Sequence, residues 1–165
     1  MFFWFLGLSF AAVLVVFSSP GLDYRLVMAG AVLPVVEGFV GGPWVLHTLL
    51  APVVVLTLVM LATQGRRLVR RQWLGLPIGL FMHLVLDGSW ANAEVFWWPF
   101  LGLADVLGGS MVPEFQRSVG VLALMELVGL GALAFLVSRL DLLGEGKELF
   151  ISKGQLLRSR LDQGD

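Results

Sequence analysis

The apolar stretch LPIGLFMHLVLDG, residues 76–88, contains a histidine and a carboxylate four positions apart. Side chains with this spacing share one face of a helix, with Cβ atoms about 5–6 Å apart. His83 and Asp87 can therefore reach one centre, and imidazole nitrogen with carboxylate oxygen is a common ligand set for zinc and other divalent ions. Two other roles are open: a hydrogen bond from His83 to a neighbouring helix, and capping of the helix end by Asp87.

Glu37, in LPVVEG, and His47, in PWVLHTLLAP, add a second carboxylate and a second imidazole. The chain has two histidines and no cysteine, so a metal site must use imidazole and carboxylate ligands. With His83 and Asp87, these residues predict a divalent metal site, with zinc as the expected ion. Three protein ligands would leave one position for water, whose pKa a bound metal lowers toward about 7. Glu37 or Asp87 would then act as a catalytic base, or would orient a ligating histidine from behind.

The composition is that of an integral membrane protein. Hydrophobic residues make up 58% of the chain and charged residues 14%, whereas soluble domains carry about 25% charged residues. The net charge of −1 gives no electrostatic basis for binding nucleic acid. The first apolar run has no basic residues before it, so we expect a retained helix rather than a cleaved signal peptide.

We expect an all-α bundle of about five transmembrane helices, since one helical span takes roughly 20 apolar residues. The apolar runs are residues 2–18, 26–40, 44–63, 73–86 and 118–137. The second run is short and is interrupted by Pro34 and Glu37, so it is either a kinked span or a re-entrant segment. Residues 1–139 would form the membrane domain, and residues 140–165 a polar cytoplasmic tail that could lie on the membrane as an amphipathic helix.

The orientation follows from a group of arginines between the third and fourth runs: Arg66, Arg67, Arg70 and Arg71. Positive loops stay in the cytoplasm, so we expect a multi-pass protein of the inner or plasma membrane with its C-terminus inside. The Trp-rich connection after the fourth run, residues 89–117, then lies outside. Membrane lipids are the expected contacts of the bundle.

This orientation places Glu37, His47, His83 and Asp87 at one depth, near the outer ends of their segments. Ionisable side chains inside membrane segments are costly and are by default candidates for a functional site. Glu126, in the middle of the last run, is better explained by a polar contact with a neighbouring helix, although it could also support the site or relay protons.

Three blocks of the chain resemble, in order, those of the YdjM-type family of membrane-bound, metal-dependent hydrolases: LPVVEG, PWVLHTLLAP and GLPIGLFMHLVLDGSWANAEVFWWPF. The family has a Leu-Pro-Asp-x-Asp block, then a His-Arg-Gly-x-Thr-His-Ser block that opens a helix. A Ser-His-x-x-x-Asp block and a Gly/Trp-Pro stretch follow. By position, Glu37 stands at the second aspartate and His47 at the second histidine, while His83 and Asp87 match the third block. The resemblance implies that these four residues hold the metal.

The chain departs from this pattern at several positions. Val35 replaces the first aspartate of the first block, and Gly42-Pro43 replaces the leading His-Arg of the second. The resemblance therefore implies a divergent relative, which either keeps a reduced metal site or serves another role.

Three functions follow from these patterns. The first is a membrane-embedded hydrolase in which metal-activated water attacks a lipid-like or phosphoester substrate near the outer leaflet. The second is a non-catalytic assembly subunit that packs against a membrane-protein partner or a second copy of the chain. The third, proton relay or transport, is the least favoured, because the cytoplasmic halves of the apolar runs offer almost no polar residues.

Overall fold

In the computed structural model, residues 1–40, 44–101 and 117–161 are described, and every regular element among them is a helix. The predicted all-α class is confirmed for this part of the chain. The elements are α1 (Phe2–Phe17), α2 (Tyr24–Val32), α3 (Val35–Val40), the 3₁₀ turn η1 (Val45–His47), α4 (Leu50–Ala62), α5 (Arg67–Trp73), α6 (Gly75–Asp87), the 3₁₀ turn η2 (Ser89–Ala91), α7 (Ala93–Phe96), α8 (Val119–Arg139), α9 (Lys147–Lys153) and α10 (Arg158–Leu161).

Each of the five predicted apolar runs contains a helix, and the second run is divided in two. α2 ends at Val32 and α3 begins at Val35, so the break falls at Leu33-Pro34. Proline has no backbone N–H and its ring clashes with the preceding turn, which ends a helix. The third run begins with η1 before α4, and the Trp-rich connection contains η2 and α7. Residues 102–116 of that connection lie outside the described part.

The arginine-rich segment that we expected to be a short loop is partly helical. Gly65 has a φ of 75°, a left-handed conformation that glycine adopts readily, and it turns the chain after α4. α5 follows at Arg67, because arginine, leucine and glutamine all favour helix. The prediction of a loop between 63 and 73 is therefore wrong over most of its length.

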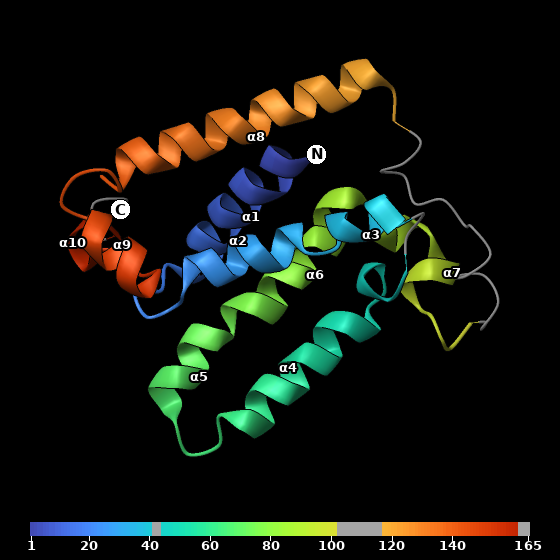
Figure 1. The fold of residues 1–165 in the computed structure, drawn as a ribbon, viewed down its shortest axis with the longest axis horizontal. Coiled ribbons are helices and arrows are strands. Elements are labelled where there is room, and N and C mark those ends of the chain that lie inside the picture. Colours follow the sequence, from blue (N-terminus) through green and yellow to red (C-terminus); the bar gives the residue numbers. More distant parts are fainter. Residues whose placement is uncertain (41–43, 102–116, 162–165) are drawn as a thin grey trace.

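α2 and α6 form the centre of the bundle and lie side by side (Figure 1). Their backbones approach so closely that a Cβ atom on Gly79 would lie 2.1 Å from the carbonyl oxygen of Val27. A Cβ atom on Gly30 would lie 2.3 Å from the carbonyl oxygen of Leu76. Glycines at such positions let membrane helices pack tightly. This contact fixes α6, which carries His83 and Asp87, against α2.

α8 packs on α1 through a second glycine contact, between Gly7 and Gly129. Its one buried-run carboxylate, Glu126, accepts hydrogen bonds from the backbone N–H groups of Phe2 (2.5 Å) and Phe3 (2.7 Å). The first N–H groups of a helix lack partners within the helix and carry partial positive charge, so a carboxylate is stabilised there. The predicted contact of Glu126 with a neighbouring helix is confirmed.

Among the described helices, α8 is the one long and apolar enough to cross a membrane, with 21 residues. α1 and α4 are apolar but shorter. That five segments cross a membrane therefore stays a prediction.

The C-terminal segment folds back against the start of α2. Leu140, Leu142 and Leu156 are buried in the same cluster as Phe10 and Tyr24. The backbone N–H of Tyr24 donates to the carbonyl oxygen of Gly154 over 2.8 Å. α9 and α10 thus lie at one end of the bundle, opposite the end that carries α3 and α7 (Figure 1). Whether residues 140–165 also lie on a membrane surface stays a prediction.

Candidate metal centre

The four residues singled out in the sequence meet at the α3 end of the bundle. Glu37 is in α3, His47 closes η1, and His83 and Asp87 are in the last turns of α6. His47, His83 and Asp87 are fully buried, and Glu37 is 8% exposed. Because α2, α3 and η1 are arranged around the end of α6, residues 50 positions apart share one small volume.

Three ligand atoms of this group converge. The Nε2 atoms of His47 and His83 are 3.4 Å apart, and Oδ2 of Asp87 is 3.6 Å from Nε2 of His83 and 3.8 Å from Nε2 of His47. A circle through three atoms with these separations has a radius of about 2.1 Å, which matches the usual distance of zinc from nitrogen or carboxylate oxygen. One point is therefore at bonding distance from all three atoms, and the group could hold a metal ion.

The other nitrogen of each imidazole is fixed by an acceptor. Nδ1 of His83 lies 2.7 Å from the carbonyl oxygen of Ala31, which can only accept, so Nδ1 carries the proton. Nδ1 of His47 lies 2.8 Å from Oε2 of Glu37 and donates in the same way. In the neutral rings, both Nε2 atoms then present a lone pair to the common centre. Histidines that bind metals almost always make such a second hydrogen bond to a carboxylate or a carbonyl.

Glu37 supports this centre from behind. Its Oε2 accepts hydrogen bonds from Nδ1 of His47 and the backbone N–H of Trp44 (both 2.8 Å), and Oε1 accepts from the N–H of Leu46 (2.9 Å). Its carboxylate therefore faces Nδ1 of His47, away from the convergent Nε2 atoms. Of the two roles predicted for Glu37, the geometry favours orientation of His47 over direct ligation.

Asp87 is held by the residues that follow it. Its Oδ1 accepts from the backbone N–H of Ser89 (2.6 Å), and its Oδ2 accepts from the Ser89 hydroxyl (2.5 Å). The turn depends on Gly88, which ends α6 with a φ of 83°. The backbone carbonyl of Asp87 accepts from Arg117 (2.6 Å), so an arginine closes the C-terminus of α6.

Four partners of the site were not found by sequence reasoning: Phe5, Ala31, Ser89 and Arg117. The ring of Phe5 stacks on His83, with centroids 4.0 Å apart. Phe5 and Ala31 act through packing and a backbone carbonyl, for which a sequence offers no distinctive signal. Ser89 does have one, because a carboxylate often accepts a hydrogen bond from the backbone two residues further along the chain.

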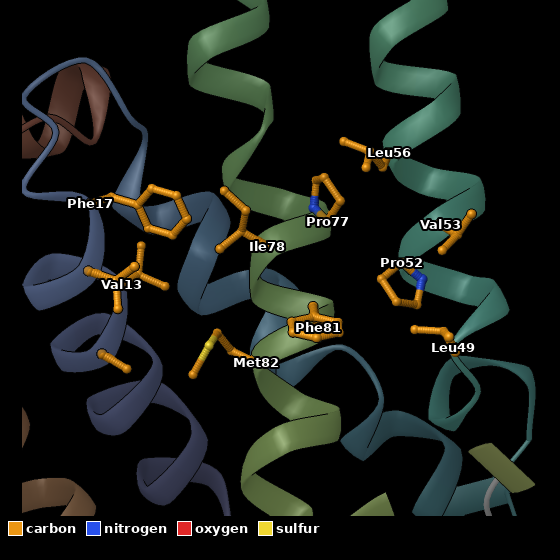
Figure 2. A pocket seen from close by; sticks show the side chains of 12 residues that line it. Val13, Phe17, Leu49, Pro52, Val53, Leu56, Pro77, Ile78, Phe81 and Met82 are labelled. Atoms are coloured by element: carbon orange, nitrogen blue, oxygen red, sulfur yellow. The ribbon is translucent and has the colours of Figure 1, made fainter. Parts of the chain in front are cut away.

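An apolar groove runs beside the site between α1, α4 and α6, with a volume of about 430 Å³. Figure 2 shows side chains of these three helices around a common space, with Leu49 and Val53 on α4 and Phe81 and Met82 on α6. The walls of this groove continue directly into the metal centre along the chain, because Leu49 stands two residues after His47 and Met82 precedes His83.

Comparisons of the chain with protein-family models, curated protein sequences and solved structures each give no match.

Proposed function

We propose that this chain is an integral membrane protein whose His47, His83 and Asp87 bind a divalent metal ion, with zinc as the first candidate. It would use this ion to hydrolyse a lipid-like or phosphoester substrate near the outer leaflet. The observation that supports this most directly is the triangle of two Nε2 atoms and one carboxylate oxygen, with both histidines held through Nδ1.

A cation explains why these groups face one another. Two lone pairs and a carboxylate oxygen repel at 3.4–3.8 Å, and burial disfavours an ionised carboxylate. A bound divalent ion turns that repulsion into attraction. Two imidazoles and one carboxylate suit zinc, whereas magnesium and calcium prefer oxygen ligands alone.

A metal held there would supply activated water near neutral pH. Hydrolysis adds the hydroxyl of water to an acyl carbon or phosphorus, breaks the bond to the leaving oxygen, and transfers the proton to that oxygen. Asp87 lies at the centre and is the carboxylate placed to carry the proton. Glu37 acts through His47, since a carboxylate on Nδ1 makes Nε2 a better ligand.

The exposed surface supports the membrane location. Large apolar side chains are more than two-fifths exposed along α4 and α8, including Leu58, Leu61, Leu124, Leu127 and Phe135. Apolar patches of this extent are rare on soluble proteins and mark contact with lipid or with another protein. We extend this to five crossing segments, with the arginines of α5 and the C-terminal segment on the cytoplasmic side.

The hydrolase class comes from the resemblance to the YdjM-type family. The residues retained from that pattern, Glu37, His47, His83 and Asp87, are those gathered at the candidate centre. Val35, which replaces an aspartate of the pattern, is in α3 and is not among the converging ligands.

The direct test is the metal content of the protein purified in detergent without chelator. We expect about one zinc per chain, and its loss in His47→Ala and His83→Ala. Glu94→Gln, an exposed carboxylate of α7, is the control and should keep the metal. Substitution by cobalt would give the visible absorption of a tetrahedral site. A wild-type chain that binds no divalent ion, as purified or on titration, would contradict the proposal.

The alternative is a non-catalytic assembly subunit that keeps the metal site. One observation favours it: α8 packs mainly on α1, so most of its apolar surface faces outward. Cross-linking in membranes would distinguish the two functions. A stable partner or dimer that survives His83→Ala, in a protein without hydrolase activity, would favour the subunit.

A further inference from the structure

The apolar groove can take only an apolar ligand. All twelve residues that line it are apolar, and its volume of about 430 Å³ is within the usual range for small-molecule sites. Val53 and Phe81, one on each side, are about half exposed, so the groove opens at the surface of the bundle. In a membrane, the ligand that can enter from this side is an acyl chain.

A smaller cavity of about 110 Å³ joins the groove at the start of α4. The two spaces share Leu49 and Val53 as walls. The backbone N–H of Leu49 donates to the carbonyl oxygen of Phe96 over 2.9 Å, which holds the segment after α7 against α4. That segment contributes Trp98 to the second cavity.

Trp98 provides the polar feature that the groove lacks. Its indole Nε1 is buried and has no hydrogen-bond acceptor within the part of the chain that the structure describes. Buried donors without a partner are uncommon in folded proteins, and each one needs an explanation. The other residues of this cavity have apolar side chains, so the acceptor must come from a ligand.

We propose that the groove and the Trp98 cavity together bind one acyl chain of a membrane lipid ester. The chain occupies the groove, and an ester oxygen accepts the hydrogen bond of the Trp98 indole. Leu49, the wall common to both spaces, is two residues from His47, so this oxygen lies at the end of the groove next to the metal centre. This inference rests on the proposed function, because it names the substrate class of the same site.

The chain-binding part is tested with a phospholipid that carries a photoreactive group on its acyl chain, incorporated with the protein into lipid nanodiscs. We expect cross-links to residues of α4 and α6 that line the groove. Val53→Trp fills the wall shared by both spaces and should lower cross-linking about tenfold, as for a contact worth 1.4 kcal/mol. Val54→Trp is the control, since Val54 is equally exposed on the same helix and lines neither space.

The ester oxygen is tested by comparing this lipid with its ether analogue, which lacks the carbonyl group. Wild type should prefer the ester by up to about tenfold, the effect of one buried hydrogen bond. Trp98→Phe keeps an aromatic ring without the N–H and should remove the preference. Trp90→Phe, at an exposed tryptophan in η2, should retain it.

The measurements are made with zinc and after chelation, and the metal content of each variant reports whether its site is still folded. Cross-linking and ester preference that persist in a chain without metal would support the lipid site and contradict the hydrolase. A metal-binding chain in which Val53→Trp and Val54→Trp cross-link alike, or in which Trp98→Phe keeps the ester preference, would overturn the lipid site alone.

Discussion

The two ends of the bundle each bury an aspartate, but they surround it differently. At the end that carries α9 and α10, Asp23 accepts hydrogen bonds from the backbone N–H of Arg25 (3.0 Å) and from its guanidinium at 3.1 Å and 2.8 Å. At the α3 end, Asp87 faces the Nε2 atoms of two histidines whose protons are committed to Nδ1.

This difference separates a structural ion pair from a binding site. Arg25 neutralises Asp23 within the chain and reaches on to the carbonyl oxygens of Ile151 and Ser152, so the pair joins the C-terminal segment to α2. Around Asp87 the convergent atoms of the histidines are electron-pair donors, and a cation balances them. Burial of a carboxylate is therefore a weak sign of function until its neighbours are known.

Exchanging each aspartate for asparagine should give the largest contrast. Asp87→Asn should lower zinc affinity about 100-fold or more, above the 10–100-fold typical of an outer partner, because a charged ligand is lost. Asp23→Asn should leave zinc affinity unchanged. Competition against a chromogenic chelator measures both, and equal affinities would remove the distinction between the two ends.

Removal of the metal should destabilise the wild-type protein. A ligand present at 100 times its Kd adds about 2.7 kcal/mol to the stability of the folded state. Chelation should therefore lower the melting temperature of wild type and of Asp23→Asn, measured in detergent by the fluorescence of the tryptophans. His47→Ala should melt at the same temperature with and without chelator; a shift as large as that of wild type would place the metal elsewhere.

Glu37→Gln tests the support behind His47. The amide keeps an oxygen that can accept the Nδ1 proton but removes the negative charge, so zinc affinity should fall about 10–100-fold. Isothermal titration would measure this, with Glu94→Gln as the matched exposed control. A loss as complete as that of His47→Ala would instead assign Glu37 to direct ligation.

Arg25→Ala should have the smallest effect on folding. Its side chain is more than one-third exposed, and exposed ion pairs contribute about 0.2–1 kcal/mol. The C-terminal segment should become easier to cleave by protease, because two carbonyl contacts are also lost. Zinc affinity should stay at the wild-type value; a decrease would show that the two ends are coupled.

Much of the fold could be predicted from the sequence because apolar runs report helices directly. The His83–Asp87 pair followed from helical spacing, and its meeting with His47 followed from the shared depth of their segments. The role of Glu37 could not be assigned in the same way. Which side of an imidazole a carboxylate reaches depends on the turn at 44–47, and turn geometry is poorly encoded by hydropathy.

The arginine segment shows a second limit. Hydropathy identified where the apolar run ends, but it could not tell a loop from α5, since both are polar. The acceptor for His83 is a backbone carbonyl, and every residue has one. Only the position of the helix break decides that Ala31 is available.

That break, at Leu33-Pro34, bears on which ions the centre would admit. It ends α2 beside Ala31 and starts α3 three residues before the end of the turn that brings Glu37 into position, so one interruption aligns both imidazoles. With both rings set in this way, the spacing of the ligand atoms acts as a gauge of ionic radius. Calcium, which needs about 2.3–2.6 Å and six to eight oxygen ligands, would be rejected on size and ligand number together.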